Sequence, residues 1–264
     1  MASRFLALPL VLTFGVVACG GGQPAPAPAS QEQPTSATQP AVDPATAASI
    51  SGVVSFEGTA PANAGIKMNA DPVCIKANTT PQTQETYMVK DGKLGNVFVF
   101  VQDGLGSRTF PTPTTAVVLD QHNCRYHPHV FGLMVGQPMT ILNSDPTLHN
   151  IHAIPATNQE FNTAQPIQGM KTEHKFTAKE AKTIIPFKCD VHGWMNAYVG
   201  VLDHPYFAVT GEDGKFEIKD LPPGTYTLAA WHEKAGTKTM SVTVAAKDKK
   251  EDANFSFSAP AAGN

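Results

Sequence analysis

The stretch Lys188-Cys189-Asp190-Val191-His192-Gly193-Trp194-Met195 places a thiol, an imidazole and a thioether on one short segment, in the order C-x-x-H-x-x-M. A one-electron copper site uses such donors: a soft sulfur, imidazole nitrogens and a weak axial thioether. The second imidazole must come from elsewhere. It is expected from Asn143-Ser144-Asp145-Pro146-Thr147-Leu148-His149-Asn150, a turn-rich stretch whose His-Asn end begins a predicted strand. The predicted ligands of one copper ion are therefore His149, Cys189, His192 and Met195.

With both segments in view, the chain resembles the cupredoxins, the blue or type 1 copper proteins, and its loop is most similar to that of amicyanin. The resemblance is specific over residues 143–152 and 185–202. It implies that Asn150 hydrogen-bonds across to the Cys loop and that Phe187 is the aromatic residue of the family's aromatic-x-Cys pattern. One position departs from the pattern, because Gly193 stands where amicyanin-type loops carry Pro.

The resemblance also implies how electrons would enter and leave. In cupredoxins the loop His lies nearest the solvent and serves as the electron port, a role that falls here to His192 with Trp194 beside it. Trp194 is expected either in an apolar rim for a redox partner or in the core. His152, further along the strand that begins near His149, is expected on the same face and is the substitute ligand.

Other metals fit the loop less well. Structural zinc usually takes paired Cys or His ligands and seldom Met. A binuclear copper centre would need a second Cys on the loop, and Cys189 is alone there.

The sequence contains four cysteines, and its N-terminal segment, described below, predicts export. Cys19 is assigned to a lipid and Cys189 to the metal, which leaves Cys74 and Cys124 for a disulfide, a bond that persists in oxidising compartments. The alternative is a second metal site in Cys124-Arg125-Tyr126-His127-Pro128-His129.

The N-terminal segment is typical of a secretory signal peptide. Residues 1–18 hold an apolar run that is too short for a membrane-spanning helix, which needs about 20 residues. The run ends in Val16-Val17-Ala18-Cys19-Gly20, which resembles a bacterial lipobox and implies an acylated Cys19. Gly20, not an acidic residue, favours the outer membrane. Residues 19–48 are rich in Pro, Ala and Gln and are expected to form a flexible tether.

The remainder is expected to be all-β. Short apolar runs bounded by Gly, Pro, Asn or Asp predict strands, and no convincing 3.6-residue period is present. Residues 49–204 would form a cupredoxin-like Greek-key β-sandwich. Residues 205–258 resemble the small β-sandwich of carboxypeptidase-regulatory-like domains, and residues 259–264 form a tail. The stretch 50–58 matches the opening of that second family, so the copper domain is alternatively an insertion within it.

The net charge of −3 includes no basic stripe, so nucleic acid is not an expected partner. The sequence predicts a lipid-anchored periplasmic protein, not an enzyme, that carries single electrons between redox partner proteins. Two alternatives remain: a copper carrier or store without redox turnover, and a copper enzyme that would need a second copper or an open coordination position.

Overall fold

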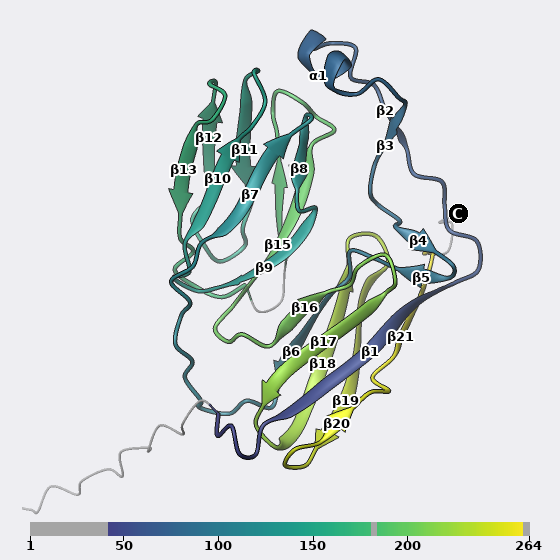
Figure 1. Ribbon diagram of the computed structural model, residues 1–264, viewed down its shortest axis with the longest axis vertical. Helices are drawn as coiled ribbons and strands as arrows, with labels where there is room; N and C mark the ends of the chain where they lie inside the picture. The colour runs from purple at the N-terminus through teal and green to yellow at the C-terminus, as the bar shows by residue number, and fades with distance from the viewer. Residues whose placement is uncertain (1–41, 181–183, 261–264) are drawn as a thin grey trace, which may run out of the picture. The chain divides into compact units, whose positions relative to one another are not determined.

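The computed structural model describes residues 42–180 and 184–260. Cys19 and the expected tether as far as residue 41 lie outside this range. No helix among the described residues is long and apolar enough to cross a membrane. The regular secondary structure of the described chain is almost entirely β-strand, as predicted (Figure 1).

The elements follow one another in this order: β1 (Ala48–Glu57), β2 (Gly65–Ile66), α1 (Pro72–Ala77), β3 (Gln82–Thr83), β4 (Val89–Lys90), β5 (Lys93–Leu94), β6 (Phe98–Asp103), β7 (Val117–His122), β8 (Arg125–His127), β9 (Val130–Met134), β10 (Met139–Asn143), β11 (His149–Ala153), β12 (Phe161–Gln165), β13 (Lys171–His174), β14 (Ile185–Lys188), β15 (Asn196–Leu202), β16 (Phe207–Val209), β17 (Lys215–Leu221), β18 (Gly224–His232), β19 (Gly236–Val244), β20 (Lys249–Lys250) and β21 (Phe255–Ser258).

Strands β7 to β15 build the first sandwich. One sheet has the order β13-β10-β7-β8 and the other the order β12-β11-β14-β15-β9. Apolar side chains from both sheets share one core, which includes Ile141, Ile151 and Phe187. Burying a side chain such as Phe187 contributes about 1.5–3 kcal/mol. Cys189 and Met195 belong to the same core cluster, so two predicted ligands are anchored in it.

The second sandwich takes more of the chain than the sequence predicted. Its sheets have the orders β17-β1-β5-β4, with β20 and β21 also paired to β1, and β16-β6-β18-β19. The boundary that placed residues 49–204 in one copper domain therefore does not hold. Strands β1 and β6 pair with C-terminal strands, and β5 and β4 join the same sheet through β1. The first sandwich is inserted between β6 and β16, which is the alternative that the sequence left open.

The reason lies in β1 and β6. Buried and partly exposed residues alternate along β1, which places Ile50 and Val54 in a core shared with β17 and β18. Gly52 lies on the same buried face, and a Cβ there would come within 2.2 Å of the Ala253 carbonyl oxygen. The apolar residues 97–101, which lead into and form most of β6, are all buried, as their unbroken run predicted.

The helix α1 was not expected. It begins at Asp71, whose side chain accepts a hydrogen bond from the Val73 amide, with Pro72 at the first helical position. Asp followed by Pro is a regular helix start, but the helix has only six residues and no apolar period to reveal it.

Candidate metal centre

The register of three strands brings the two predicted ligand segments together. Strands β14 and β15 pair Lys188 with Asn196, so residues 189–195 form the loop that joins them. Strand β11 runs antiparallel to β14 and pairs His152 with Lys188. The first residue of β11, His149, therefore lies beside the start of the Cys loop. The loop is closed by the Cys189 amide donating to the Met195 carbonyl and the Met195 amide donating to the His192 carbonyl, at 3.1 and 2.8 Å.

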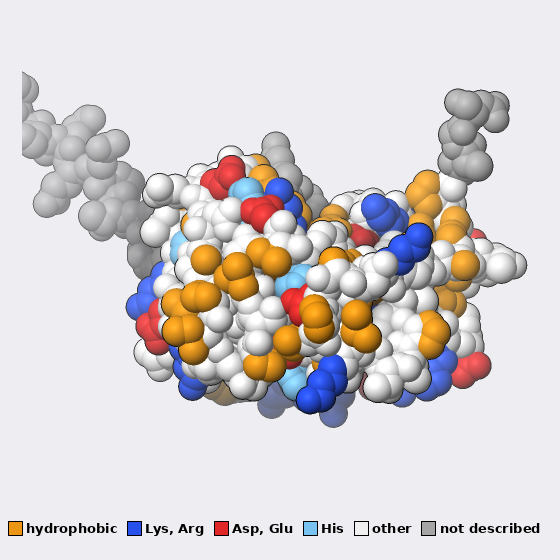
Figure 2. Space-filling model, turned by 90° about the horizontal axis from the view of Figure 1, so that it is seen from above, with side chains coloured by type: hydrophobic (Ala, Val, Ile, Leu, Met, Phe, Trp, Pro, Cys, Tyr) orange, Lys and Arg blue, Asp and Glu red, His pale blue; other side chains and the backbone are white. Residues whose placement is uncertain are grey.

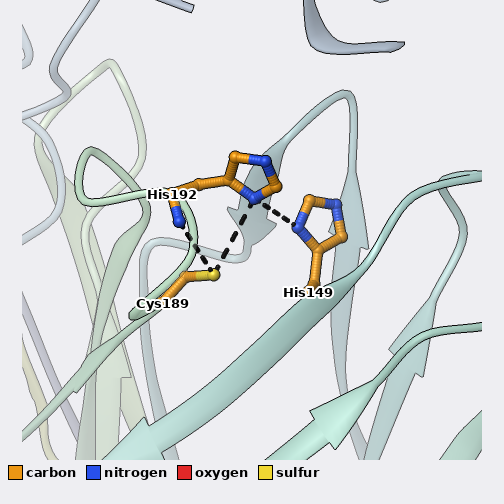
Figure 3. A group of neighbouring side chains, drawn as sticks. All are labelled: His149, Cys189 and His192. Carbon is orange, nitrogen blue, oxygen red and sulfur yellow. Dashed lines mark hydrogen bonds between the residues drawn. The ribbon is translucent and has the colours of Figure 1, made fainter. Parts of the chain in front are cut away.

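Three of the four predicted ligands converge on one point. The donor atoms of His149, Cys189 and His192 all lie within 4.8 Å of one another, and all three side chains are buried. The two Nδ1 atoms are 2.9 Å apart, and the His192 Nδ1 is 3.9 Å from the Cys189 sulfur. Figure 3 shows both imidazole rings turned toward each other above the thiol.

The opposite edge of each ring contacts a carboxylate. The His149 Nε2 is 2.9 Å from Asp145 Oδ2, and the His192 Nε2 is 3.0 Å from Asp71 Oδ2. An ionised carboxylate only accepts hydrogen bonds, so each Nε2 carries the proton. This arrangement is the usual outer-shell support of a metal-binding histidine, because it fixes the tautomer and the direction of the ring.

The consequence is a donor set that fits a cation. With both Nε2 atoms protonated, two Nδ1 lone pairs face each other beside a sulfur, which is unfavourable unless a proton or a metal ion lies between them. Two imidazole nitrogens and a thiolate suit copper or zinc, and the soft sulfur favours them over magnesium or calcium. These residues could therefore hold the copper ion that the sequence predicts.

The surroundings favour the thiolate form of Cys189. Burial raises the pKa of this thiol, but hydrogen bonds from the backbone and from the His149 and His192 rings, when a proton lies at their Nδ1 atoms, outweigh it and lower the pKa to about 6. Burial lowers the pKa of His149, but Asp145 and Cys189 raise it more. Both shifts follow from close pairing of opposite charges in a buried site.

Asn150 forms the hydrogen bonds across to the loop that were expected of it. Its side-chain oxygen accepts from the Asp190 amide at 2.7 Å and lies 3.2 Å from the Cys189 sulfur. The Tyr126 hydroxyl donates to the Asn150 carbonyl oxygen from β8. Asn150 therefore fixes the β11 segment to the loop, and Tyr126 fixes the same segment to β8.

The fourth predicted ligand, Met195, lies at the end of the same loop. Its side chain is 2% exposed and belongs to the apolar cluster that contains Cys189 and Phe187. Phe187 packs edge-to-face on Phe131, with ring centroids 6.1 Å apart, and supports the strand that leads to Cys189.

His192 does not have the solvent exposure that its predicted role as electron port requires. It is only 2% exposed, because the segment that begins at Asp71 covers its outer edge. Trp194 is half-buried: its ring lies 5.0 Å from that of His192, and its indole N–H donates to the Cys124 carbonyl at 3.0 Å. The expectation failed because Asp71 and Cys74, which contact the outer edge of His192, lie outside the stretches that carry the family resemblance.

The predicted disulfide is confirmed, since Cys74 and Cys124 are bonded. Cys124 is thus unavailable as a ligand in the alternative second metal site. The two histidines of that site also lie in different environments. His127 is exposed, whereas His129 is buried, with its Nε2 2.6 Å from a Glu233 carboxylate oxygen.

His152 does not share the face of His149, and that expectation was wrong. The two residues are three positions apart on a strand, an odd separation that places them on opposite faces. The His152 ring points outward, with its nitrogens 2.7 Å from Glu160 and 2.9 Å from Asp190. These carboxylates raise its pKa.

Asp71, Asp145 and Tyr126 were missed by the sequence analysis. Asp145 lies four residues before His149 in the turn, a spacing that could have indicated a partner. It also accepts from the amides of Asn123 and Cys124, at 2.8 and 2.7 Å. Asp71 carries no such signal, because it lies 121 residues from the histidine that it contacts.

Comparisons with known proteins leave the family of this chain open. A model of polysaccharide lyase family 4, domain II, matches residues 177–252. No curated protein matches. Among solved structures, a point mutant of amicyanin in its Cu(I) form is 22% identical over 33% of this chain and 81% of that one, with a TM-score of 0.29.

Two further structures are similar over part of the chain. A purple cupredoxin from Nitrosopumilus maritimus is 24% identical over 33% of this chain and 98% of its own, with a TM-score of 0.27. A copper-containing nitrite reductase from Thermus scotoductus SA-01 is 18% identical, with a TM-score of 0.31; the match covers 38% of this chain and only 25% of the reductase.

Proposed function

We propose that the chain is a mononuclear type 1 copper protein that carries single electrons between redox partner proteins in the cell envelope. The observation that supports this most directly is the convergence of two Nδ1 atoms and one thiol, with each opposite ring edge held by a carboxylate. Two His and one Cys in a plane with a weak axial Met form the donor set of blue copper electron-transfer sites.

His149, Cys189 and His192 would hold the copper, with Met195 as a weak fourth donor. When bound, copper supplies a one-electron Cu(II)/Cu(I) couple. The chain contributes rigidity, because transfer is fast when the ligands move little between the two oxidation states. Asp145 and Asn150 hold the His149 strand, the closed backbone of the loop holds Cys189, and Asp71 holds His192.

Partner docking would use the surface around the covered site. Leu148, Val191 and Ile75 are 40–50% exposed, and each is a sequence neighbour of a predicted ligand or of the disulfide. On the face drawn in Figure 2, hydrophobic side chains lie in separate groups, with acidic and basic side chains between them. Small apolar contacts without strong charge suit brief association.

We further propose that acylated Cys19 anchors the protein in the bacterial outer membrane, with the tether leaving the copper domain free in the periplasm. Its basis is the lipobox-like sequence alone. An anchored carrier stays near its partners, and several acyl chains give stable membrane attachment where one does not.

A second candidate is a copper carrier or store, favoured by one observation: the covered edge of His192 reduces the contact that a redox partner could make with a ligand. A carrier would hold Cu(I) without redox turnover.

The deciding experiment is the visible spectrum and voltammetry of the protein loaded with Cu(II). We expect one copper per chain, an intense thiolate-to-copper band and a reversible one-electron wave. Cys189→Ser is the control, because it keeps the loop but removes the thiolate and should remove the band. A colourless protein that binds zinc in preference to copper would refute the proposal. A band that is lost on reduction and not regained would favour the carrier.

A further inference from the structure

Residues 71–78, here called the cap, close the outer side of the candidate metal centre. Their first residue, Asp71, places its Oδ2 3.0 Å from the Nε2 of His192. The Cys74 sulfur lies 3.8 Å from the same nitrogen. Together these contacts leave the His192 side chain 3% exposed. The cap thus buries the ring edge that points away from the other ligands.

The Asp71 carboxylate is itself held in place. Its Oδ1 accepts from the Val73 amide at 2.7 Å, and its Oδ2 accepts from the Thr147 hydroxyl at 2.7 Å as well as from His192. Thr147 belongs to the turn that leads to His149. One carboxylate therefore contacts both predicted ligand segments, and only 15% of its side-chain surface is exposed.

Two bonds fasten the cap to the first sandwich. Cys74 is joined to Cys124 by the disulfide, and the Asn78 side chain donates to the Asn123 carbonyl at 3.0 Å. Both contacts reach the same turn, between β7 and β8. Cys74 and Cys124 are fully buried, so this disulfide is part of the packing around the site.

The same turn supports the other histidine. Asp145 accepts from the Asn123 and Cys124 amides and from His149, at 2.8, 2.7 and 2.9 Å. Asn123 and Cys124 both have positive φ, a backbone conformation that residues other than Gly rarely adopt. The hydrogen bonds to Asp145 stabilise this conformation. The disulfide therefore links the support of His192 to the support of His149.

We propose that the cap is a positioning element of the metal centre, in which Asp71 holds His192 in the Nε2–H tautomer and the disulfide-anchored segment closes the site to exogenous ligands. This inference rests on the proposed function, because a positioning role for the cap presupposes the metal site. Its physical basis is the general effect of outer-shell partners: they orient a ligand ring, raise its basicity and typically change metal affinity about 10–100-fold when removed.

The tautomer is measurable without any metal. Nitrogen-15 NMR of the histidine rings in the metal-free full-length chain distinguishes Nε2–H from Nδ1–H. We expect His192 as the Nε2–H tautomer in the wild type and a mixture of tautomers in Asp71→Ala. His149 should not change, since Asp145 remains. Lys76→Ala, an exposed charge removal on the same helix, is the matched control and should leave both rings as in the wild type.

Closure of the site is tested on the Cu(II)-loaded protein. We expect the Kd for Cu(II) to rise roughly 10- to 100-fold in Asp71→Ala. Added azide should perturb the spectrum of this variant and of the double variant Cys74→Ala/Cys124→Ala more than that of the wild type. The double variant keeps Asp71 but frees the cap, so it tests closure even if Asp71→Ala folds poorly.

The outcomes separate this inference from the proposed function. An unchanged His192 tautomer in Asp71→Ala, or an azide response equal to wild type in both variants, would overturn the inference whatever the metal. If the tautomer shifts as expected but the loaded wild type lacks a type 1 spectrum, the positioning role of Asp71 holds and the electron-transfer proposal fails.

Discussion

Removing the Cys74–Cys124 disulfide should lower the free energy of unfolding by about 4 kcal/mol. The bond joins residues 50 positions apart. In the chain-entropy model a loop of this size loses about 14 cal/mol/K on closure in the unfolded state, which is about 4 kcal/mol at 25 °C. Measured losses of native disulfides fall between about 2 and 5 kcal/mol.

The perturbation is the double variant Cys74→Ala/Cys124→Ala, studied in the metal-free protein so that copper binding adds nothing. Urea unfolding followed by fluorescence gives the free energy and its slope. A loss of about 4 kcal/mol lowers the midpoint by more than about 1 M at usual slopes. Cys189→Ala is the matched control: it removes another buried cysteine without removing a cross-link.

The reasoning is refuted if the double variant loses less than about 1 kcal/mol while peptide mapping confirms the disulfide in the wild type. That result would mean that the unfolded chain is already restricted near these residues, or that the cap contributes little to the folded state. A loss well above about 5 kcal/mol would show that the bond also holds packing that its absence disrupts.

Three other predictions concern the site and the anchor. The reduction potential should increase in the order Met195→Gln, wild type, Met195→Leu, because a harder oxygen donor favours Cu(II) and loss of the donor favours Cu(I); equal potentials by voltammetry would mean that Met195 is not axial. In the metal-free protein the thiol of Cys189 should ionise with a pKa of about 6, followed by the ultraviolet absorbance of the thiolate, and a value near that of a free thiol would contradict the hydrogen bonds from His149 and His192. Cys19→Ser should release the protein from the membrane fraction without changing the copper spectrum, and continued membrane association would exclude the lipid anchor.

The fold class and the ligand loop could be predicted because their signals are local. Short apolar runs between turn residues predict strands one at a time, and Cys189, His192 and Met195 show their spacing within seven residues. The assignment of β1 and β6 to the second sandwich is different. It depends on which strands pair over long distances, as Val54 does with Phe255. The motif at residues 50–58 allowed this assignment of β1 as an alternative, whereas nothing in the sequence of β6 indicated its partners.

The closure of the site depends on contacts of the same distant kind. The family resemblance rests on the ligand segments and implies that the loop histidine is exposed to solvent. Nothing in those segments indicates that another part of the chain covers it. Asp71, which is 121 residues away from His192 in the sequence, covers the edge of that ring in the folded chain. It can do so because the disulfide fixes where its carboxylate lies, and because a charged acceptor is stable beside a buried imidazole only where that imidazole donates to it. The ligands can thus be predicted from the sequence. Their exposure to solvent, on which the route of the electron depends, is set by the cap, and the position of the cap is evident only in the folded chain.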